Sequence, residues 1–169
     1  GIVSLLSIDS ISVSRISHPE DRFSLGQRIK AVVKGRDERL EVKNNISRGR
    51  IALSHKELLG TWSENAELFE IGQTVAGIVR SVESYGIFIE LAPNLAGLSE
   101  YASGVFEGQQ ASVYIKSIIP EKMKVKLLIV DAFDGECTKQ KPKYFYEGNH
   151  IDYFLYSPKN SKKIIETFF

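Results

Sequence analysis

The feature that most constrains the fold is an alternating stretch at residues 73–91, QTVAGIVRSVESYGIFIEL. In its first half Val75, Gly77 and Val79 occupy every second position, and after the break at residues 84–86 the alternation resumes through Ile87. A period of two with β-branched residues is typical of a strand, and a glycine-containing break between two such runs is typical of a hairpin. The stretch therefore predicts a β-hairpin.

Three further short strands are expected after this hairpin. Pro93 and Asn94 favour a turn, and short alternating runs then occur at residues 96–98, 108–116 and 124–127. Five short strands in about 60 residues, without a long helix, suit a small closed barrel. We therefore predict an all-β fold, with one complete barrel domain over residues 69–134.

Part of the pattern also occurs upstream, at a spacing of 82 residues. Gly26-Gln27 begins an alternating run that matches the run after Gly108-Gln109, and residues 49–53 resemble a fifth strand. The hairpin of residues 73–91 has no counterpart before the first run. We therefore expect residues 1–57 to be the C-terminal part of a first barrel, so that the chain begins inside that domain. The alternative is a pairing of residues 1–13 that the pattern does not reveal.

The segments outside the two copies predict short helices and one strand. Residues 58–68 form a linker, with a possible capping box at Ser54 and Glu57 and a second cap at Ser63, so two short helical turns are expected around it. The tail, residues 135–169, predicts a strand over 150–158 and a short helix through Phe168, an α/β extension. Because the tail is rich in aromatic residues, we expect it to pack on the second barrel. A docking surface is the alternative.

Composition excludes several classes of protein. A hydrophobic content of 43% and a charged content of 25% are ordinary for a globular protein. No apolar run approaches the roughly 18 residues of a membrane span, and no signal peptide is evident. With the single thiol Cys137, a cytoplasmic protein is expected. The three histidines lack a metal-ligand spacing, and no nucleophile or phosphate-loop motif occurs, so we predict no catalysis, no metal and no cofactor.

The order and spacing of these segments resemble the S1-type RNA-binding domain family. The resemblance is carried by Val-x-Gly-x-Val at 75–79, Tyr-Gly-Ile-Phe-Ile-Glu-Leu at 85–91, Gly97-Leu98 and the run after Gly108. Residues 15–21 and 56–72 are similar to segments of the tandem repeats of bacterial ribosomal protein S1. The resemblance covers residues 4–131 and implies five-stranded barrels of the OB type that bind single-stranded RNA on an exposed face.

Carried over position by position, the resemblance implies that Tyr85 and Phe88 stack on bases. Glu100 stands where the family has a histidine, Pro120 where it has an aspartate, and Lys124 where it has an arginine. In the first copy the arginine position is kept as Arg50. The strand pattern independently favours Phe88, because it falls on the face opposite to Ile87 and Ile89 and a base can stack on any exposed aromatic ring. Packing of this ring under a loop is the alternative.

Basic side chains form two candidate phosphate-contacting sets. Lys116, Lys124 and Lys126 share the outward phase of neighbouring strands, and Arg80 lies opposite to Val79 in its strand. Arg28, Lys30 and Lys34 share a strand phase in the first copy, and Arg50 is a candidate neighbour of this set. Ordinary solvated surface is the alternative for both sets. Residues 70–134 carry 5 basic and 8 acidic side chains, which disfavours strong nonspecific RNA binding by that domain alone.

The sequence therefore predicts a non-catalytic, single-stranded-RNA-binding module of a bacterial type, acting in translation or mRNA handling, with the ribosome as a further partner. The alternative is a protein-interaction module that holds its parent protein to a ribosome or another protein, favoured by Glu100 and the acidic barrel. An accessory domain of a ribonuclease is a third option.

Overall fold

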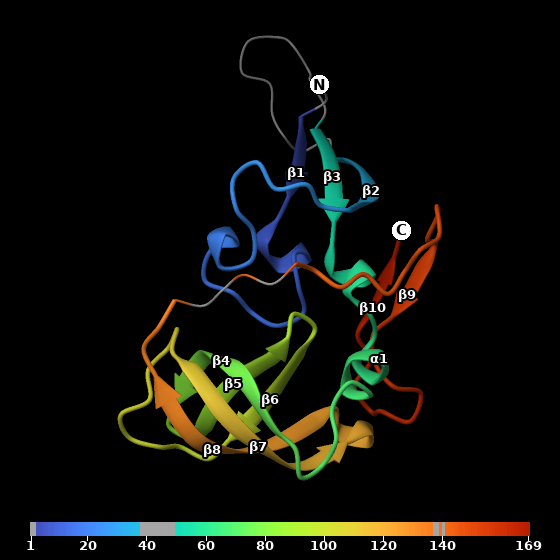
Figure 1. Cartoon of the computed structure of the whole chain (residues 1–169). Helices are drawn as coiled ribbons and strands as arrows, with labels where there is room; N and C mark the ends of the chain where they lie inside the picture. Colours follow the sequence, from blue (N-terminus) through green and yellow to red (C-terminus); the bar gives the residue numbers. More distant parts are fainter. Residues whose placement is uncertain (1–2, 38–49, 137–138, 140) are drawn as a thin grey trace.

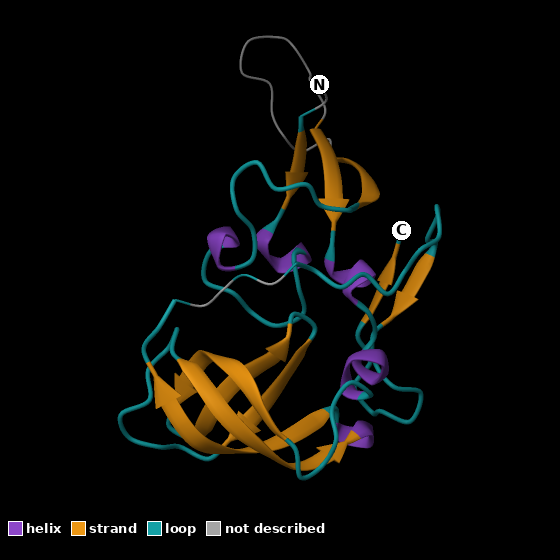
Figure 2. Ribbon diagram, viewed as in Figure 1, coloured by secondary structure: helices purple, strands orange, loops and turns teal. Residues whose placement is uncertain are grey.

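The computed structural model describes residues 3–37, 50–136, 139 and 141–169, and the chain is mostly β in structure (Figures 1 and 2). The strands are β1 (Ser4–Leu6), β2 (Val32–Asp37), β3 (Arg50–Ser54), β4 (Thr74–Glu83), β5 (Gly86–Ala92), β6 (Leu95–Ser99), β7 (Gln110–Ile119), β8 (Lys124–Phe133), β9 (Tyr153–Leu155) and β10 (Glu166–Phe168). The α-helix is α1 (Trp62–Ala66), and short 3-10 helices span Ile8–Ser10, Pro19–Asp21, Lys56–Leu59 and Pro120–Lys122.

Strands β4 to β8 form a closed barrel in the order β4-β5-β6-β8-β7, with β7 pairing back to β4. The alternating apolar residues fill it: Val79, Ile87, Ile89, Val113 and Ile115 are all fully buried. Their neighbours along each strand point outward because successive side chains of a strand alternate between faces. The predicted five-stranded barrel is confirmed, and the hairpin lies where the alternation placed it.

Gly86 allows β5 and β6 to approach closely at the start of the hairpin's second strand. A Cβ atom at this position would lie 2.6 Å from the carbonyl oxygen of Ser99 and 2.8 Å from Cδ1 of Leu98. The first of these neighbours is backbone in a paired strand, so it has little freedom to move. The glycine in the Tyr-Gly-Ile-Phe segment is therefore required by packing between β5 and β6.

Strands β1, β2 and β3 form a separate three-stranded sheet in the N-terminal lobe, which we define as residues 3–37 and 50–54. In it β3 pairs in parallel with β1 and antiparallel with β2. The barrel contains the same arrangement, since β8 pairs in parallel with β6 and antiparallel with β7. Among the described residues this lobe does not close into a barrel, so the predicted tandem is seen as one complete barrel and one three-stranded sheet.

The linker contains two short helical turns, as expected. The 3-10 helix Lys56–Leu59 ends at Gly60, whose φ of 93° is one that glycine adopts readily. Helix α1 is capped by Thr61, which exchanges hydrogen bonds with Glu64 in a capping box, and not by the predicted Ser63. Trp62, the first helical residue, is 3% exposed and belongs to the main apolar core.

The C-terminal extension is a β-hairpin: β9 lies within the predicted strand over 150–158, and β10 takes the place of the predicted helix. Residues of β10 pair antiparallel with β9, with Phe168 opposite Tyr153. The helix prediction was wrong because burial along residues 164–169 alternates with a period of two, which is the period of a strand.

Tyr156, just after β9, attaches this hairpin to the barrel. Its ring lies in the same apolar core as the barrel residues, and its hydroxyl donates to the carbonyl oxygen of Asn94 at 2.5 Å. Burial raises the pKa of the Tyr156 hydroxyl. The carbonyl oxygen of Tyr156 also accepts a hydrogen bond from the backbone N–H of Trp62.

His55 lies where the N-terminal lobe, the linker and the C-terminal extension meet. It is completely buried, with Phe23 and Tyr144 packed edge-on against its ring. Nδ1 lies 2.7 Å from the carbonyl oxygen of Ile11, which only accepts, so Nδ1–H donates and Nε2 accepts from the Tyr144 hydroxyl at 3.1 Å. Burial lowers the pKa of His55 from its ordinary value, so the neutral ring is favoured.

Candidate nucleic-acid interface

Tyr85 and Phe88 lie together at the turn between β4 and β5. Their ring centroids are 6.2 Å apart and the ring planes meet at 83°, an edge-to-face contact. Tyr85 is 69% exposed, and Phe88 is half-buried while its neighbours Ile87 and Ile89 face the core. The structure thus places both aromatic residues on the outer side of the barrel, the location that the strand pattern predicted for Phe88.

Strand register places Lys126 on the same outer face as this pair. Phe88 is paired with Leu98 on β6, and Leu98 is paired with Lys126 on β8. Because neighbouring strands lie about 4.8 Å apart, the Cα atoms of Phe88 and Lys126 are separated by about 10 Å. Lys124, two residues earlier on β8, is exposed on the same side.

Lys116 lies at a register shift of β7, between Ile115 and Ser117. Ser117 is paired with Lys126, so Lys116 lies beside the lysines of β8. All three lysines are exposed. The predicted outward phase of this set is therefore present, and the outer face from β5 across β6 to β8 and β7 combines aromatic rings with basic side chains.

Arg80 does not join this group. It lies at the register shift of β4 between Val79 and Ser81, and its guanidinium donates to Glu90 Oε2 at 3.1 Å. Its side chain is 14% exposed. The ion pair directs this arginine along β5, away from the aromatic pair at the turn.

Glu90 is the centre of a buried charge cluster that sequence reasoning missed. Arg22, from the N-terminal lobe, donates to Glu90 Oε2 at 2.9 Å and to Oε1 at 2.6 Å. Arg22 also donates to the hydroxyl of Ser12 at 3.0 Å. The Nε atoms of Arg22 and Arg80 are buried and have no hydrogen-bond partner within the described part of the chain.

The basic set of the first copy is dispersed. Arg28 and Lys30 are exposed, but they precede β2, which begins at Val32, so the predicted strand phase does not apply to them. The backbone N–H of Lys30 donates to the Tyr144 hydroxyl, and its Nζ lies 5.5 Å from the centre of that ring. Lys30 therefore contacts the C-terminal extension. The side chain of Arg50 lies outside the described residues.

Two of the three positions that depart from the family pattern, Glu100 and Pro120, lie just beyond the ends of strands. Glu100 directly follows β6 and is exposed, and Pro120 begins a 3-10 helix between β7 and β8. Within the described residues no group of three or more His, Cys, Asp or Glu side chains is arranged to hold a metal ion. None of the described helices has the length and apolar character needed to cross a membrane.

Comparison with known proteins relates the chain to a ribosomal protein. It is 33% identical over 148 residues to small ribosomal subunit protein bS1 of Staphylococcus aureus, covering 80% of this chain and 36% of that protein. It is 29% identical over 167 residues to bS1 of Rickettsia conorii, covering 91% of this chain and 27% of that protein. These matches confirm the predicted resemblance to the repeats of bacterial ribosomal protein S1.

A third relative is an enzyme. The 4-hydroxy-3-methylbut-2-enyl diphosphate reductase of Fusobacterium nucleatum is 31% identical over 127 residues, covering 75% of this chain but 14% of the enzyme. The chain thus spans about one seventh to one third of the length of these relatives. No protein-family model matches the chain.

Proposed function

We propose that this chain, a distant homologue of small ribosomal subunit protein bS1, binds single-stranded RNA and does no chemistry on it. The observation that carries the proposal is the outward-facing pair Tyr85 and Phe88 on a closed barrel, with Lys126 in register on the same face. Stacking on aromatic rings combined with nearby cations is how sequence-tolerant single-strand binders work.

The bound strand lies, in this proposal, across the outer face of β5, β6 and β8. Tyr85 and Phe88 stack on bases, and Lys116, Lys124 and Lys126 contact phosphates. Stacking contributes about 1–3 kcal/mol per base, and phosphate contacts make the affinity strongly dependent on salt. Arg80 contributes through its ion pair with Glu90, which supports β4 and β5 beneath the interface.

We also propose that the N-terminal lobe is the C-terminal part of a first S1-type barrel. The support is its strand pairing, which repeats the β6-β8-β7 arrangement of the complete barrel. Residues that match buried core positions of the barrel are exposed in the lobe. Val33, for example, is 61% exposed, while its counterpart Ile115 is fully buried. Arg28, Lys30 and Arg50 would then belong to a second RNA-contacting surface.

A role in translation or mRNA handling at the ribosome, and therefore in the cytoplasm, is proposed because the bS1 relatives are small ribosomal subunit proteins. The test is a titration of the protein with decauridylate, followed by amide chemical shifts. Shift changes in β5, β6 and β8, with affinity falling as salt is raised, are expected. Unchanged spectra at low salt would overturn the proposal.

A second candidate function is protein docking. It is favoured by the exposed Glu100 at the end of β6, beside the proposed RNA face, and by the excess of acidic side chains in residues 70–134, with 5 basic and 8 acidic. A folded protein that binds no RNA in the titration would select this function.

A further inference from the structure

A cleft of about 620 Å³ lies along the outer face of β4, between the barrel and the N-terminal lobe. Its volume is within the range of sites that bury small ligands, about 300–1,000 Å³. Residues 141–145, which follow β8 in the chain, lie between the barrel and the lobe (Figure 1). Together with Lys139 they form one wall of the cleft and are called the crossing segment here. Three parts of the sequence that are far apart therefore meet at one concave surface.

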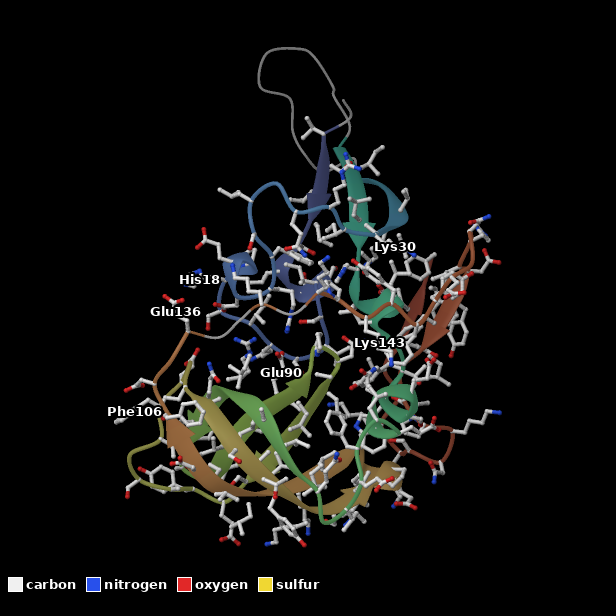
Figure 3. All side chains as sticks on the ribbon, viewed as in Figure 1. His18, Lys30, Glu90, Phe106, Glu136 and Lys143 are labelled. Carbon is white, nitrogen blue, oxygen red and sulfur yellow. The ribbon has the colours of Figure 1, made fainter. Side chains whose placement is uncertain are left out.

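Three lysines of the crossing segment line the cleft. Lys139, Lys141 and Lys143 alternate at every second position and all three belong to its wall. Because all three lysines line the cleft, they present a group of cations to it. Figure 3 shows Lys143 on this segment and Glu90 on the side of the barrel that faces the lobe.

The cleft is positive although the barrel is not. Its lining contains five basic side chains, Arg22, Arg80, Lys139, Lys141 and Lys143, and three acidic ones, Glu20, Asp21 and Glu90, a balance of 5 − 3 = +2. Several of these groups already have partners within the protein. Glu90 is paired with Arg22 and Arg80, and Asp21 accepts from the backbone N–H groups of Ser17 and His18. Residues 70–134 alone have a balance of 5 − 8 = −3. The crossing segment thus supplies cations that the barrel lacks.

The cleft is continuous with the proposed RNA face. Phe88 and Glu90 are two residues apart on β5 and therefore point to the same outer side, about 7 Å apart along the strand. Phe88 belongs to the aromatic pair, whereas Glu90 lines the cleft. A nucleic-acid strand that leaves the aromatic pair along β5 in this direction enters the cleft within about one nucleotide step.

We propose that a single RNA strand stacked on Tyr85 and Phe88 continues along β5 into this cleft, where Lys139, Lys141 and Lys143 contact its phosphates. The inference rests on the proposed function and extends it to a second surface and a longer binding site. Short RNA occupies only the face of β5, β6 and β8, and longer RNA uses both surfaces. Because only longer RNA reaches the three lysines of the cleft, affinity increases with RNA length.

The test compares two triple variants of equal charge with two RNA probes, tetrauridylate and decauridylate. One variant replaces the cleft lysines (K139A, K141A and K143A), and the control replaces three exposed lysines of the loop between β9 and β10 (K159A, K162A and K163A). The cleft variant is expected to bind decauridylate about tenfold more weakly at about 0.1 M salt. Its slope of log affinity against log salt should fall by about 2, since each lost phosphate contact removes about 0.7.

Tetrauridylate affinity is expected to be the same in both variants and the unchanged protein. Lys139 donates to the carbonyl oxygen of Phe23 and Lys143 lies over the Phe145 ring, so their loss has a structural component. The single variant Lys141→Glu avoids this, because Lys141 makes no hydrogen bond or ion pair with another described residue. Lys141→Glu should weaken decauridylate binding but not tetrauridylate binding.

Two outcomes separate the proposals. If the cleft and control variants bind decauridylate equally while Phe88→Ala weakens binding, RNA contact in the cleft is overturned and the proposed function stays intact. Absence of binding by the unchanged protein would overturn both.

Discussion

The guanidinium of Arg22 donates to both carboxylate oxygens of Glu90, although the two residues are 68 positions apart in the sequence. The side chains are 8% and 4% exposed, so the pair is largely removed from water. Arg80 donates to the same carboxylate. The N-terminal lobe is therefore attached to the barrel by a buried ion pair, and removal of Glu90 leaves two guanidinium groups without their carboxylate.

Replacing Glu90 by alanine is expected to destabilise the protein strongly. Two buried guanidinium groups would lose their shared acceptor, and breaking a buried ion pair typically costs about 3–5 kcal/mol. Urea denaturation followed by circular dichroism measures the free energy of unfolding. The double variant Arg22→Met and Glu90→Met should be less destabilised than Glu90→Ala, because one guanidinium group, that of Arg80, is left without its acceptor in place of two.

The control for this prediction is Glu107→Ala. Glu107 accepts a hydrogen bond from the Ser17 hydroxyl at an exposed position, so its removal should change the free energy of unfolding by less than about 1 kcal/mol. A loss of the same size in Glu107→Ala and Glu90→Ala would contradict the importance of burial for the Arg22 pair.

Phe88→Ala is expected to weaken RNA binding while leaving the fold intact. Loss of one stacked base corresponds to about 1–3 kcal/mol, or about 5- to 150-fold in affinity. Fluorescence anisotropy with labelled decauridylate measures the change. Tyr101→Ala is the matched control, since Tyr101 is also exposed, at 57%, but lies outside the aromatic pair. Unchanged affinity in Phe88→Ala would contradict the stacking role.

His55 is expected to make stability dependent on pH. Burial lowers its pKa in the folded protein, so the unfolded chain binds the proton more readily. The contribution of His55 to the free energy of unfolding is fully present at a pH well above 6.5, its ordinary pKa. This contribution is lost as the pH falls below 6.5, by up to about 1.4 kcal/mol per pH unit. Urea denaturation between pH 7.5 and 5.5 measures this loss.

The matched variant is His55→Gln, which has a polar side chain that does not titrate. The free energy of unfolding of this variant should fall less steeply over the same pH range, although its stability at pH 7.5 is lower. Parallel pH profiles of the two proteins would show that another group is responsible.

Gly86→Ala is expected to destabilise the barrel by about 1–3 kcal/mol, the usual cost of overpacking. The new methyl group would meet the backbone oxygen of Ser99 at 2.6 Å, and the paired strands β5 and β6 would have to separate. Gly135→Ala is the control, because a methyl group there makes only an ordinary contact at 3.5 Å with Gln110. Thermal denaturation should show a lower midpoint for the first variant alone.

The barrel could be predicted from the sequence because its signals are local. The alternation around Val79 and Ile87 and the break at Gly86 lie within about 20 residues of one another, and the observed strands β4 and β5 follow them closely. The outward position of Phe88 follows from the same alternation. Base contact by Phe88, in contrast, remains a prediction.

The charge cluster and the tail could not be predicted in the same way. The pairing of Arg22 with Glu90 depends on how two distant segments pack, and the orientation of Arg80 depends on a register shift that no local pattern reveals. Residues near Phe168 have side chains compatible with a helix, but pairing with β9 makes them a strand. Tertiary contacts decide such short segments.

The position of Tyr156 in the barrel core has a consequence for synthesis on the ribosome. The core that is built from residues 79–127 includes a ring that is translated about 30 residues later, and this ring also closes a bond to Asn94. Native packing of the nascent barrel is therefore complete only after the C-terminal hairpin has left the exit tunnel. Because translation adds about 5–20 residues per second, the barrel core lacks the Tyr156 ring for a time on the order of seconds.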